Sequence, residues 1–189
     1  MAKLTIIIAG MPGTGKTTLA LYLAKRFRLK YYAGSDFFKQ AARRLGYTIH
    51  SHDWWDSREG VRFLKQRQKD HRFDREVDRL LLEKARKGGA VMTSWTLPYL
   101  GAPGIKIWVY ASENTRARRI AKRNGIPLKE ALSMVRQRDS ENRRLYREVY
   151  GFVMGKDLEP FDIVLKTDGM PIKDVEREIL EKISRILSE

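Results

Sequence analysis

The sequence predicts a three-layer α/β fold, in which a parallel sheet of about five strands lies between layers of helices. Two observations indicate this fold. Short apolar segments alternate along the chain with longer segments whose apolar residues recur every three to four positions. The first apolar segment, residues 4–9, also runs directly into a glycine-rich stretch and then into an amphipathic segment. This is the order of strand, loop and helix.

The glycine-rich stretch matches a phosphate-binding motif. Gly10, Gly15, Lys16 and Thr17 fit the pattern G-x-x-x-x-G-K-[ST], and the alternative of a plain turn with an incidental lysine is disfavoured because all four positions are filled. Glycines let backbone N–H groups converge on phosphate oxygens, and the following helix presents its positive end. We expect Lys16 to reach the β- and γ-phosphates of ATP and Thr17 to ligate Mg²⁺. The predicted ATP-binding residues of this loop are Gly10, Met11, Pro12, Gly13, Thr14, Gly15, Lys16, Thr17 and Thr18.

The composition fits one globular domain. The chain has 189 residues, of which 42% are hydrophobic and 32% charged. No apolar run approaches the roughly 18 residues that cross a bilayer, and the N-terminal segment has the pattern of a strand rather than a signal peptide. We therefore expect a cytoplasmic protein that does not enter a membrane. The chain has no cysteine and only three histidines, which argues against disulfides, thiolate chemistry and a histidine metal site.

The net charge of +15 indicates an anionic partner. Nucleotides and nucleic acid both fit this charge, and nucleotides are the expected partner because of the phosphate loop. The sequence does not determine the oligomeric state, and a monomer is the default expectation.

The first half of the chain predicts two strand–helix units and an irregular stretch. We expect helices over 17–27 and 36–45 and a strand over 30–33. Residues 47–72 are polar and predict a loop with a short helix over the sheet edge. Trp54 and Trp55 within it are adjacent and cannot share one helix face, so one should be buried and the other exposed. Base stacking by the exposed ring is the alternative.

The second half continues the alternation. It predicts a helix over 73–87, a strand over 90–94, a loop rich in Pro and Gly, and a strand over 105–110. Helices over 112–124 and 128–150 follow, separated by Gly125. A short strand over 163–165 and a helix over 171–187 end the chain.

Arginines are concentrated in the two helices after residue 110, with few acidic residues to offset them, whereas a solvated face normally mixes both signs. Beside a phosphate loop, such arginines can spread the charge on a transferred phosphoryl group, an effect on the order of 10³-fold in rate. Closure of these helices would also exclude water. The concentrated residues are Arg116, Arg118, Arg119, Arg123, Arg136, Arg138, Arg143, Arg144 and Arg147.

These helices resemble the nucleoside monophosphate kinases, whose motif R-I-x-x-R is matched by Arg119, Ile120 and Arg123. The resemblance is closest to the archaeal cytidylate kinases. It rests on the segments AGSDFFKQAARRLG, DREVDR, IKIWVYASENTRARRIAKRNGIPLKEAL and NRRLYREVYG, and it covers nearly the whole chain. It implies a P-loop kinase fold with a short helical lid, in which Arg119 packs on the adenine and Arg123 points toward the phosphates.

The resemblance also implies how the single domain, 1–189, is organised. The core comprises 1–34, 73–112 and 160–189, the acceptor-binding region is 35–72, and the lid is about 123–150. The expected catalytic residues are Lys16, Arg123, Arg138 and Arg143. The expected acceptor-binding residues are Asp36, Lys39 and Asp74.

The chain departs from the family pattern at the acceptor site. Lys39 stands where the family tends to have arginine, and a lysine lacks the bidentate fork. Thr93, Ser94 and Trp95 replace Glu-Gly-Arg, and Leu145 replaces another arginine. The acceptor is therefore the least determined part of the function.

Four aspartates have open alternatives. Asp36 can serve Mg²⁺ or a sugar hydroxyl, or lie at the N-cap of the next helix. Asp74 and Asp78 are acceptor-site candidates, or they pair with neighbouring arginines on an exposed helix face. Asp139 is a candidate to orient an arginine of the lid.

The sequence thus predicts an ATP- and Mg²⁺-dependent kinase that phosphorylates a nucleoside monophosphate, CMP or dCMP first. One alternative is a diverged kinase of the same fold with another nucleotide, a small molecule or an RNA end as acceptor. The other is a nucleic-acid-binding ATPase, which the net charge and the tryptophans suggest.

Overall fold

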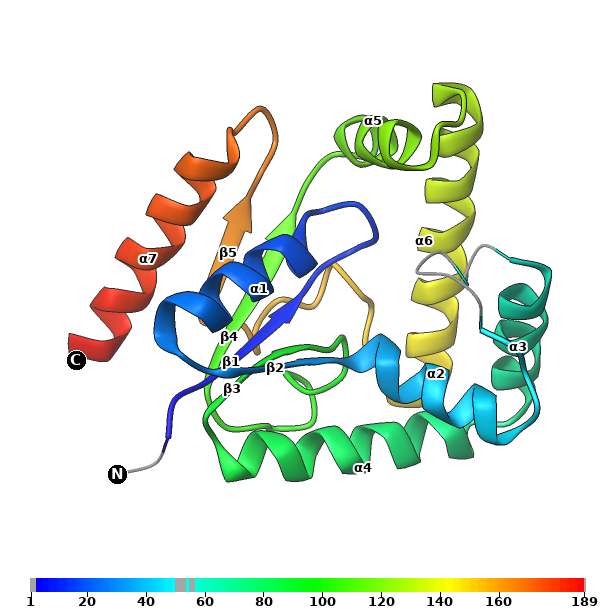
Figure 1. Ribbon diagram of the computed structural model, residues 1–189, viewed down its shortest axis with the longest axis horizontal. Coiled ribbons are helices and arrows are strands. Elements are labelled where there is room, and N and C mark those ends of the chain that lie inside the picture. Colours follow the sequence, from blue (N-terminus) through cyan, green and yellow to red (C-terminus); the bar gives the residue numbers. More distant parts are fainter. Residues whose placement is uncertain (1–2, 50–53, 55–56, 189) are drawn as a thin grey trace.

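A five-stranded parallel sheet forms the centre of the molecule. The computed structural model describes residues 3–49, Trp54 and residues 57–188 (Figure 1). The strand order is β2-β3-β1-β4-β5, and each neighbouring pair is parallel. The strands are β1 (Thr5–Ala9), β2 (Lys30–Ala33), β3 (Ala90–Thr93), β4 (Ile105–Tyr110) and β5 (Ile163–Lys166). The predicted parallel sheet is confirmed.

Helices cover both faces of this sheet. Side chains of β1 alternate between the faces: Ile6 and Ile8 pack with the helices α1 and α7, and Ile7 packs with α4. Each is fully buried, which confirms the three-layer arrangement. The helices are α1 (Lys16–Phe27), α2 (Gly34–Arg44), α3 (Arg58–Lys69), α4 (Arg72–Lys87), α5 (Glu113–Asn124), α6 (Leu128–Tyr150) and α7 (Ile172–Ser188).

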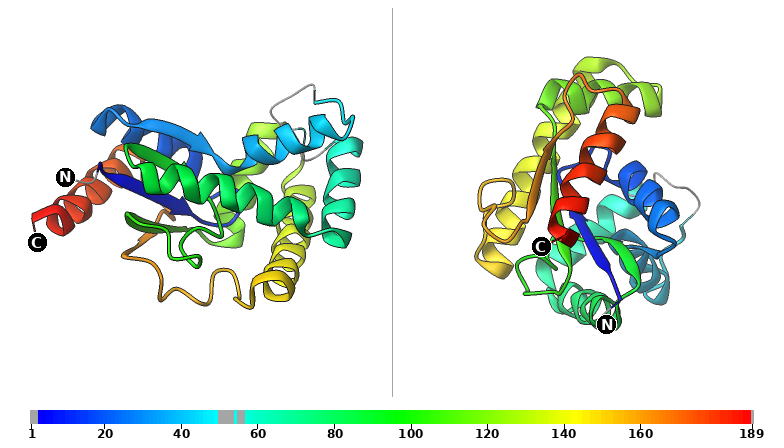
Figure 2. Two further views of the ribbon diagram at one scale, coloured as in Figure 1. Left: turned by 90° about the horizontal axis from the view of Figure 1, so that it is seen from below. Right: turned by 90° about the vertical axis from the view of Figure 1, so that its left-hand side faces the viewer.

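The segment after α2 differs from the expectation. Helix α3 lies beyond the carboxyl ends of the strands, far from the sheet in both Figure 1 and Figure 2. Phe63 of α3 and the buried Trp54 pack on Ala42 of α2, and the Phe63 ring centroid lies 6.2 Å from that of Phe73 in α4. The position predicted over the sheet edge is therefore wrong, because α2 and α4 supply the apolar surface that α3 needs. The prediction for Trp55 lies outside the described residues.

The last two helices before β5 form one packed unit. Ala117 and Ile120 of α5 pack against Ala131 and Val135 of α6, and all four are buried. Helix α6 then runs past the carboxyl ends of the strands (Figure 1), and its last turns pack in one apolar cluster with Trp95 and Tyr99, which follow β3, and with Trp108 of β4. Among the described residues, no helix is both long and apolar enough to span a bilayer.

Candidate active site

The loop between β1 and α1 has room only for glycine at two positions. A Cβ on Gly10 would lie 2.4 Å from the Val109 carbonyl oxygen. A Cβ on Gly13 would lie 3.0 Å from the Arg116 carbonyl oxygen, and the φ of Gly13 is +81°. The Thr14 hydroxyl donates to the Met11 carbonyl at 2.9 Å and is buried. The loop is thus held on one side by neighbouring backbone, and its N–H groups precede the N-terminus of α1.

Lys16 lies at the centre of the site. Its Nζ donates to the Met11 carbonyl at 3.3 Å and lies 5.7 Å from the centroid of the Trp95 ring. Its pKa is lowered from 10.5 to about 8, first by burial of the ammonium and then by the positive charges of Arg116, Arg123 and Arg138. Arg123 of α5 and Arg138 of α6 are thus near enough to the lysine of the loop to act on its charge, while their closure over the phosphates stays a prediction.

This pKa predicts a pH dependence of ATP binding. Lys16 is protonated below about pH 8 and becomes neutral above it, so the affinity for a polyphosphate should fall as the pH rises through about 8. We expect the Kd of a non-hydrolysable ATP analogue, measured by calorimetry with Mg²⁺, to be flat below pH 8 and then to rise by up to about tenfold per pH unit. Arg123→Ala removes one repelling charge and should move the break to higher pH, whereas Lys173→Ala on α7 should leave it in place. A Kd that stays flat to pH 9.5 would contradict this assignment.

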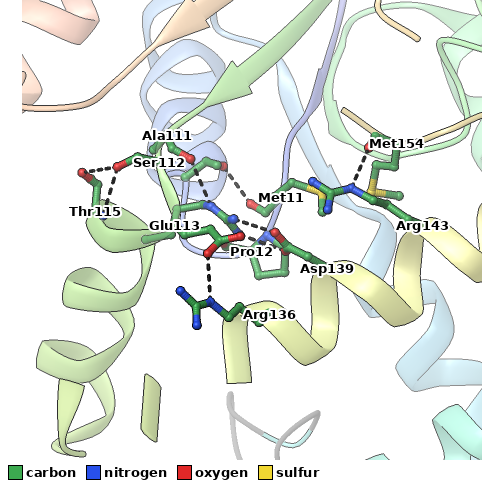
Figure 3. A network of polar contacts seen from close by, with 12 residues as sticks. Met11, Pro12, Ala111, Ser112, Glu113, Thr115, Arg136, Asp139, Arg143 and Met154 are labelled. Carbon is green, nitrogen blue, oxygen red and sulfur yellow. Dashed lines mark hydrogen bonds and ion pairs between the residues drawn. The ribbon is translucent and has the colours of Figure 1, made fainter. Parts of the chain in front are cut away.

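A buried ion pair joins the lid to the phosphate loop (Figure 3). Arg116 of α5 donates to both carboxylate oxygens of Asp139 in α6, at 3.0 and 2.6 Å. The same guanidinium donates to the carbonyls of Pro12, at 3.2 Å, and Ala111, at 3.1 Å. Both side chains are at most 4% exposed. Asp139 thus orients Arg116, which precedes the predicted lid of about 123–150, and the prediction that it orients an arginine of the lid itself stays a prediction.

Arg119 lies against the other side of the loop. Its guanidinium donates to the Thr14 carbonyl at 3.1 Å, and to the hydroxyl and carbonyl of Thr167, after β5, at 3.0 and 2.7 Å. It therefore borders the loop where the motif R-I-x-x-R implies, while its packing on an adenine stays a prediction.

Arg143 lies apart from the group around Lys16. Its Nε donates to the Met154 carbonyl at 3.4 Å, and the side chain lines a cavity on another side of α6. This placement differs from the expected closure over the phosphates, so a phosphate contact by Arg143 stays a prediction.

Thr17 and Asp36 lie near the end of β2. Burial first, and then the charge of Asp36, raise the pKa of Tyr31, whose hydroxyl lies 3.4 Å from that of Thr93, and the hydroxyls of Thr93 and Thr17 lower it. Asp36 is exposed in the first turn of α2, which begins at Gly34 with Ala33 as its cap residue, so Asp36 lies in the N-cap region of this helix, as one alternative predicted, without being the cap residue itself. Hydroxyl and carboxylate oxygens suit Mg²⁺, so the residues present fit this ion.

Two buried aspartates lie on the inner face of α4. Asp74 is 1% exposed and Asp78 6%, and Lys39 is buried on α2. Arg79 instead pairs on the exposed face, with Glu76 at 2.9 Å and Glu83 at 2.5 Å. The alternative of intrahelical pairing on an exposed face is therefore wrong for these aspartates.

Asp78 has two hydroxyl partners. It accepts from Thr96, after β3, at 2.5 Å and from the hydroxyl of Tyr150, at the end of α6. Burial, and then the charge of Asp78, raise the pKa of Tyr150 above its usual range. The Asp78 carboxylate thus joins α4 to the segment after β3 and to the end of α6.

Trp95 occupies the place of an expected arginine. Its Nε1 donates to the Gly10 carbonyl at 2.8 Å, and its ring meets that of Tyr146 edge-on at 5.5 Å. Leu145, at the other substituted position, is buried in the same apolar cluster. Trp95, Leu145 and Tyr146 therefore form an apolar surface beside the phosphate loop.

Sequence reasoning missed three of these contacts: Arg116 with Pro12, Trp95 with Gly10, and Tyr150 with Asp78. Each joins residues more than 70 positions apart. The sequence marked Gly10, Pro12, Asp78, Trp95 and Arg116 individually, but no signal paired them with their partners.

A glycine-rich loop with its lysine, arginines reaching it from helices after β4, and a β2-β3-β1-β4-β5 parallel sheet define the P-loop kinase class. The model of the cytidylate kinase-like family matches residues 5–169, and the chain belongs to this family. Curated relatives include cytidylate kinases of Pyrobaculum aerophilum, 32% identical over 97% of this chain and 94% of that one, and of Pyrococcus horikoshii, 31% identical over 87% and 80%. The chain is a kinase phosphotransferase.

Solved structures show the same fold at lower identity. A shikimate kinase from Acinetobacter baumannii in complex with shikimate aligns with a TM-score of 0.59 and 20% identity, over 97% of this chain and 94% of that one. A gluconokinase from Sinorhizobium meliloti aligns with a TM-score of 0.58 and 15% identity, over 98% and 94%. At these identities the likeness extends to the P-loop kinase fold alone.

Proposed function

We propose that the protein transfers the γ-phosphoryl group of ATP to a nucleoside monophosphate, with CMP or dCMP as the preferred acceptor. The observation that carries the proposal is the convergence of Arg116, Arg123 and Arg138 on Lys16, in a chain of the cytidylate kinase-like family. The named cytidylate kinases that match almost the full chain support CMP as the acceptor. The reaction would take place in the cytoplasm, in a monomer.

The residues of the chain divide the work between binding and charge neutralisation. The loop N–H groups and Lys16 hold the phosphates of ATP, and Arg119 borders the loop where the adenine would lie. Arg123 and Arg138 offset the charge that develops on the transferred group, and the closed lid helices keep water from competing as acceptor. Thr17 would hold Mg²⁺, which supplies further neutralisation of the phosphate oxygens.

The acceptor would lie between α2, α4 and the end of α6. Lys39 would attract its 5′-phosphate, and Asp36 and Asp74 would accept hydrogen bonds from its sugar or base. Lys39 of α2 and Asp74 of α4 are both buried, and these two helices contact each other, which supports a polar pocket for a nucleotide rather than a solvated surface.

A second candidate is a kinase of the same fold with another acceptor. Trp95 and Leu145 support it, because they put apolar side chains where the family has phosphate-binding arginines. An acceptor that needs fewer phosphate contacts than CMP would fit this apolar surface. Examples are a different nucleotide, a small hydroxylated molecule or an RNA end.

A substrate panel tests both candidates. Purified protein with ATP and Mg²⁺ is given CMP, dCMP, UMP, AMP, GMP, shikimate, gluconate or a 5′-hydroxyl oligoribonucleotide, and ADP and the phosphorylated product are both quantified by chromatography. We expect CDP or dCDP to form at least about tenfold faster than any other product, a preference that corresponds to roughly 1.4 kcal/mol. Transfer to another acceptor with CMP inert would favour the second candidate. Release of ADP with no phosphorylated product would contradict both and favour an ATPase.

A further inference from the structure

A second charged cavity lies on the lid, outside the ATP site. It has a volume of about 520 Å³ and is bounded by the N-terminus of α5, one side of α6 and residues of the segment that follows α6. Figure 3 shows four of its lining residues, Glu113, Arg136, Asp139 and Arg143, on α5 and α6. Its cationic lining residues are Arg136, Arg143, Arg144, Arg147 and Lys156.

The cavity has an excess of positive charge. Its acidic residues are Glu113, Asp139 and Glu148, and each is already matched. Glu113 pairs with Arg136 at 3.1 Å, and Glu148 lies 3.9 Å from Arg144. Asp139 is neutralised by Arg116 at 2.6 Å.

Three cations are left over once these pairs are counted. They are Arg143, Arg147 and Lys156. All three are exposed, and the side chains of Arg147 and Lys156 form no ion pair with another described residue.

The cavity is distinct from the site that holds ATP. Among the described residues that line it, none belongs to the loop from Gly10 to Thr18, and neither Arg123 nor Arg138 is one of them. The charges that act on Lys16 come from Arg116, Arg123 and Arg138 and not from the cavity's cations. Asp139 is the link, because it lines the cavity while holding Arg116 against the Pro12 carbonyl.

We propose that this cavity binds an anion with two or more phosphate groups, as a site separate from the phosphate loop. Arg143 and Arg147 are one turn apart on α6, about 6 Å along the helix, so one phosphate can meet each guanidinium while Lys156 approaches from the facing segment. Guanidinium groups bind phosphate by paired hydrogen bonds, and the volume lies in the range of small-molecule sites. The phosphates can come from a free phosphorylated molecule or from successive positions of a nucleic-acid strand.

The test measures binding with the ATP site already filled. Wild-type protein is saturated with a non-hydrolysable ATP analogue and excess Mg²⁺, and pyrophosphate is titrated by calorimetry. The variant Arg147→Ala/Lys156→Ala removes two lining cations, and Lys173→Ala/Arg185→Ala removes two exposed cations of α7 as a charge-matched control. We expect one pyrophosphate site in the wild type, a Kd raised at least about tenfold in the cavity variant, and a change below about twofold in the control. Thermal melting confirms that each variant is folded.

The outcomes separate this proposal from the proposed function. Absence of a pyrophosphate site, or equal binding in the two double variants, would overturn it whichever acceptor the kinase uses. Competition by a short oligothymidylate that is lost in Arg147→Ala/Lys156→Ala would identify nucleic-acid phosphates as the source. Pyrophosphate binding without such competition would identify a free phosphorylated molecule.

Discussion

Lys16→Ala lowers the rate of phosphoryl transfer at least about 10²-fold, which corresponds to roughly 3 kcal/mol of transition-state stabilisation. The reason is the position of the ammonium: it is the cation of the loop itself, at the N-terminus of α1, with Arg116, Arg123 and Arg138 close enough to shift its pKa. Without this ammonium, only the more distant guanidinium groups stabilise the negative charge that develops on the phosphoryl group. The measurement is kcat/KM for ATP with the best acceptor of the substrate panel.

The control for this variant is its stability. A lysine whose pKa is lowered to about 8 is charged at pH 7 in a place that disfavours the charge. Lys16→Ala should therefore melt at the same temperature as the wild type at pH 7, or slightly higher. Stability should also depend on pH: the unfavourable term is present below about pH 8 and is relieved between pH 8 and the unfolded value near 10.5. Lys173→Ala, an exposed lysine on α7, should change neither property. If Lys16→Ala keeps more than a third of the wild-type rate, the role given to Lys16 is wrong.

The fold could be predicted from the sequence because its strands and helices are local patterns. The run of isoleucines in β1 is apolar on both sides, and the structure buries Ile6 and Ile8 on one face and Ile7 on the other. The helix α3 shows the limit of such reasoning. Its polar sequence shows no single apolar stripe, and its anchor is the buried aromatic group of Trp54 and Phe63, whose partner Ala42 is on another helix. No local pattern specifies which surface such a helix covers.

The candidate site divides in the same way. The phosphate loop is contiguous, so spacing alone identified it. The contacts that hold it are distant in sequence: Trp95 with Gly10 is separated by 85 positions and Arg116 with Pro12 by 104. The placement of Arg143 illustrates a further limit. Arginines on a helix of 23 residues necessarily point in several directions, so Arg138 and Arg143 face different sites although the sequence groups them.

Asp139→Ala should be the most destabilising single substitution of a charged residue in the lid. It removes the only carboxylate that contacts Arg116 among the described residues and leaves a guanidinium that is 4% exposed without its counter-ion. Breaking one side of such a buried pair costs about 3–5 kcal/mol, and each kcal/mol lowers the Tm of a chain of this size by about 2–4 °C. We expect the Tm at pH 7, measured by calorimetry, to fall by roughly 10 °C. Urea unfolding should show the matching loss of about 3–5 kcal/mol in the free energy of unfolding. Asp174→Ala, which breaks an exposed pair with Arg177, should change the free energy of unfolding by less than about 1 kcal/mol.

The double variant Arg116→Met/Asp139→Leu distinguishes an uncompensated charge from lost packing. It removes both charges and keeps apolar volume, so it should be more stable than Asp139→Ala. If the effects of the two single substitutions on the free energy of unfolding simply added, the double variant would instead be less stable than Asp139→Ala. The double variant still lacks the Arg116 donor to the Pro12 carbonyl. Its Kd for an ATP analogue should therefore be higher than that of the wild type, although its Tm is higher than that of Asp139→Ala. Recovery of both properties together would mean that Arg116 contributes to stability but does not position the loop. Recovery of neither would mean that the two helices need the charged pair itself to pack in this register.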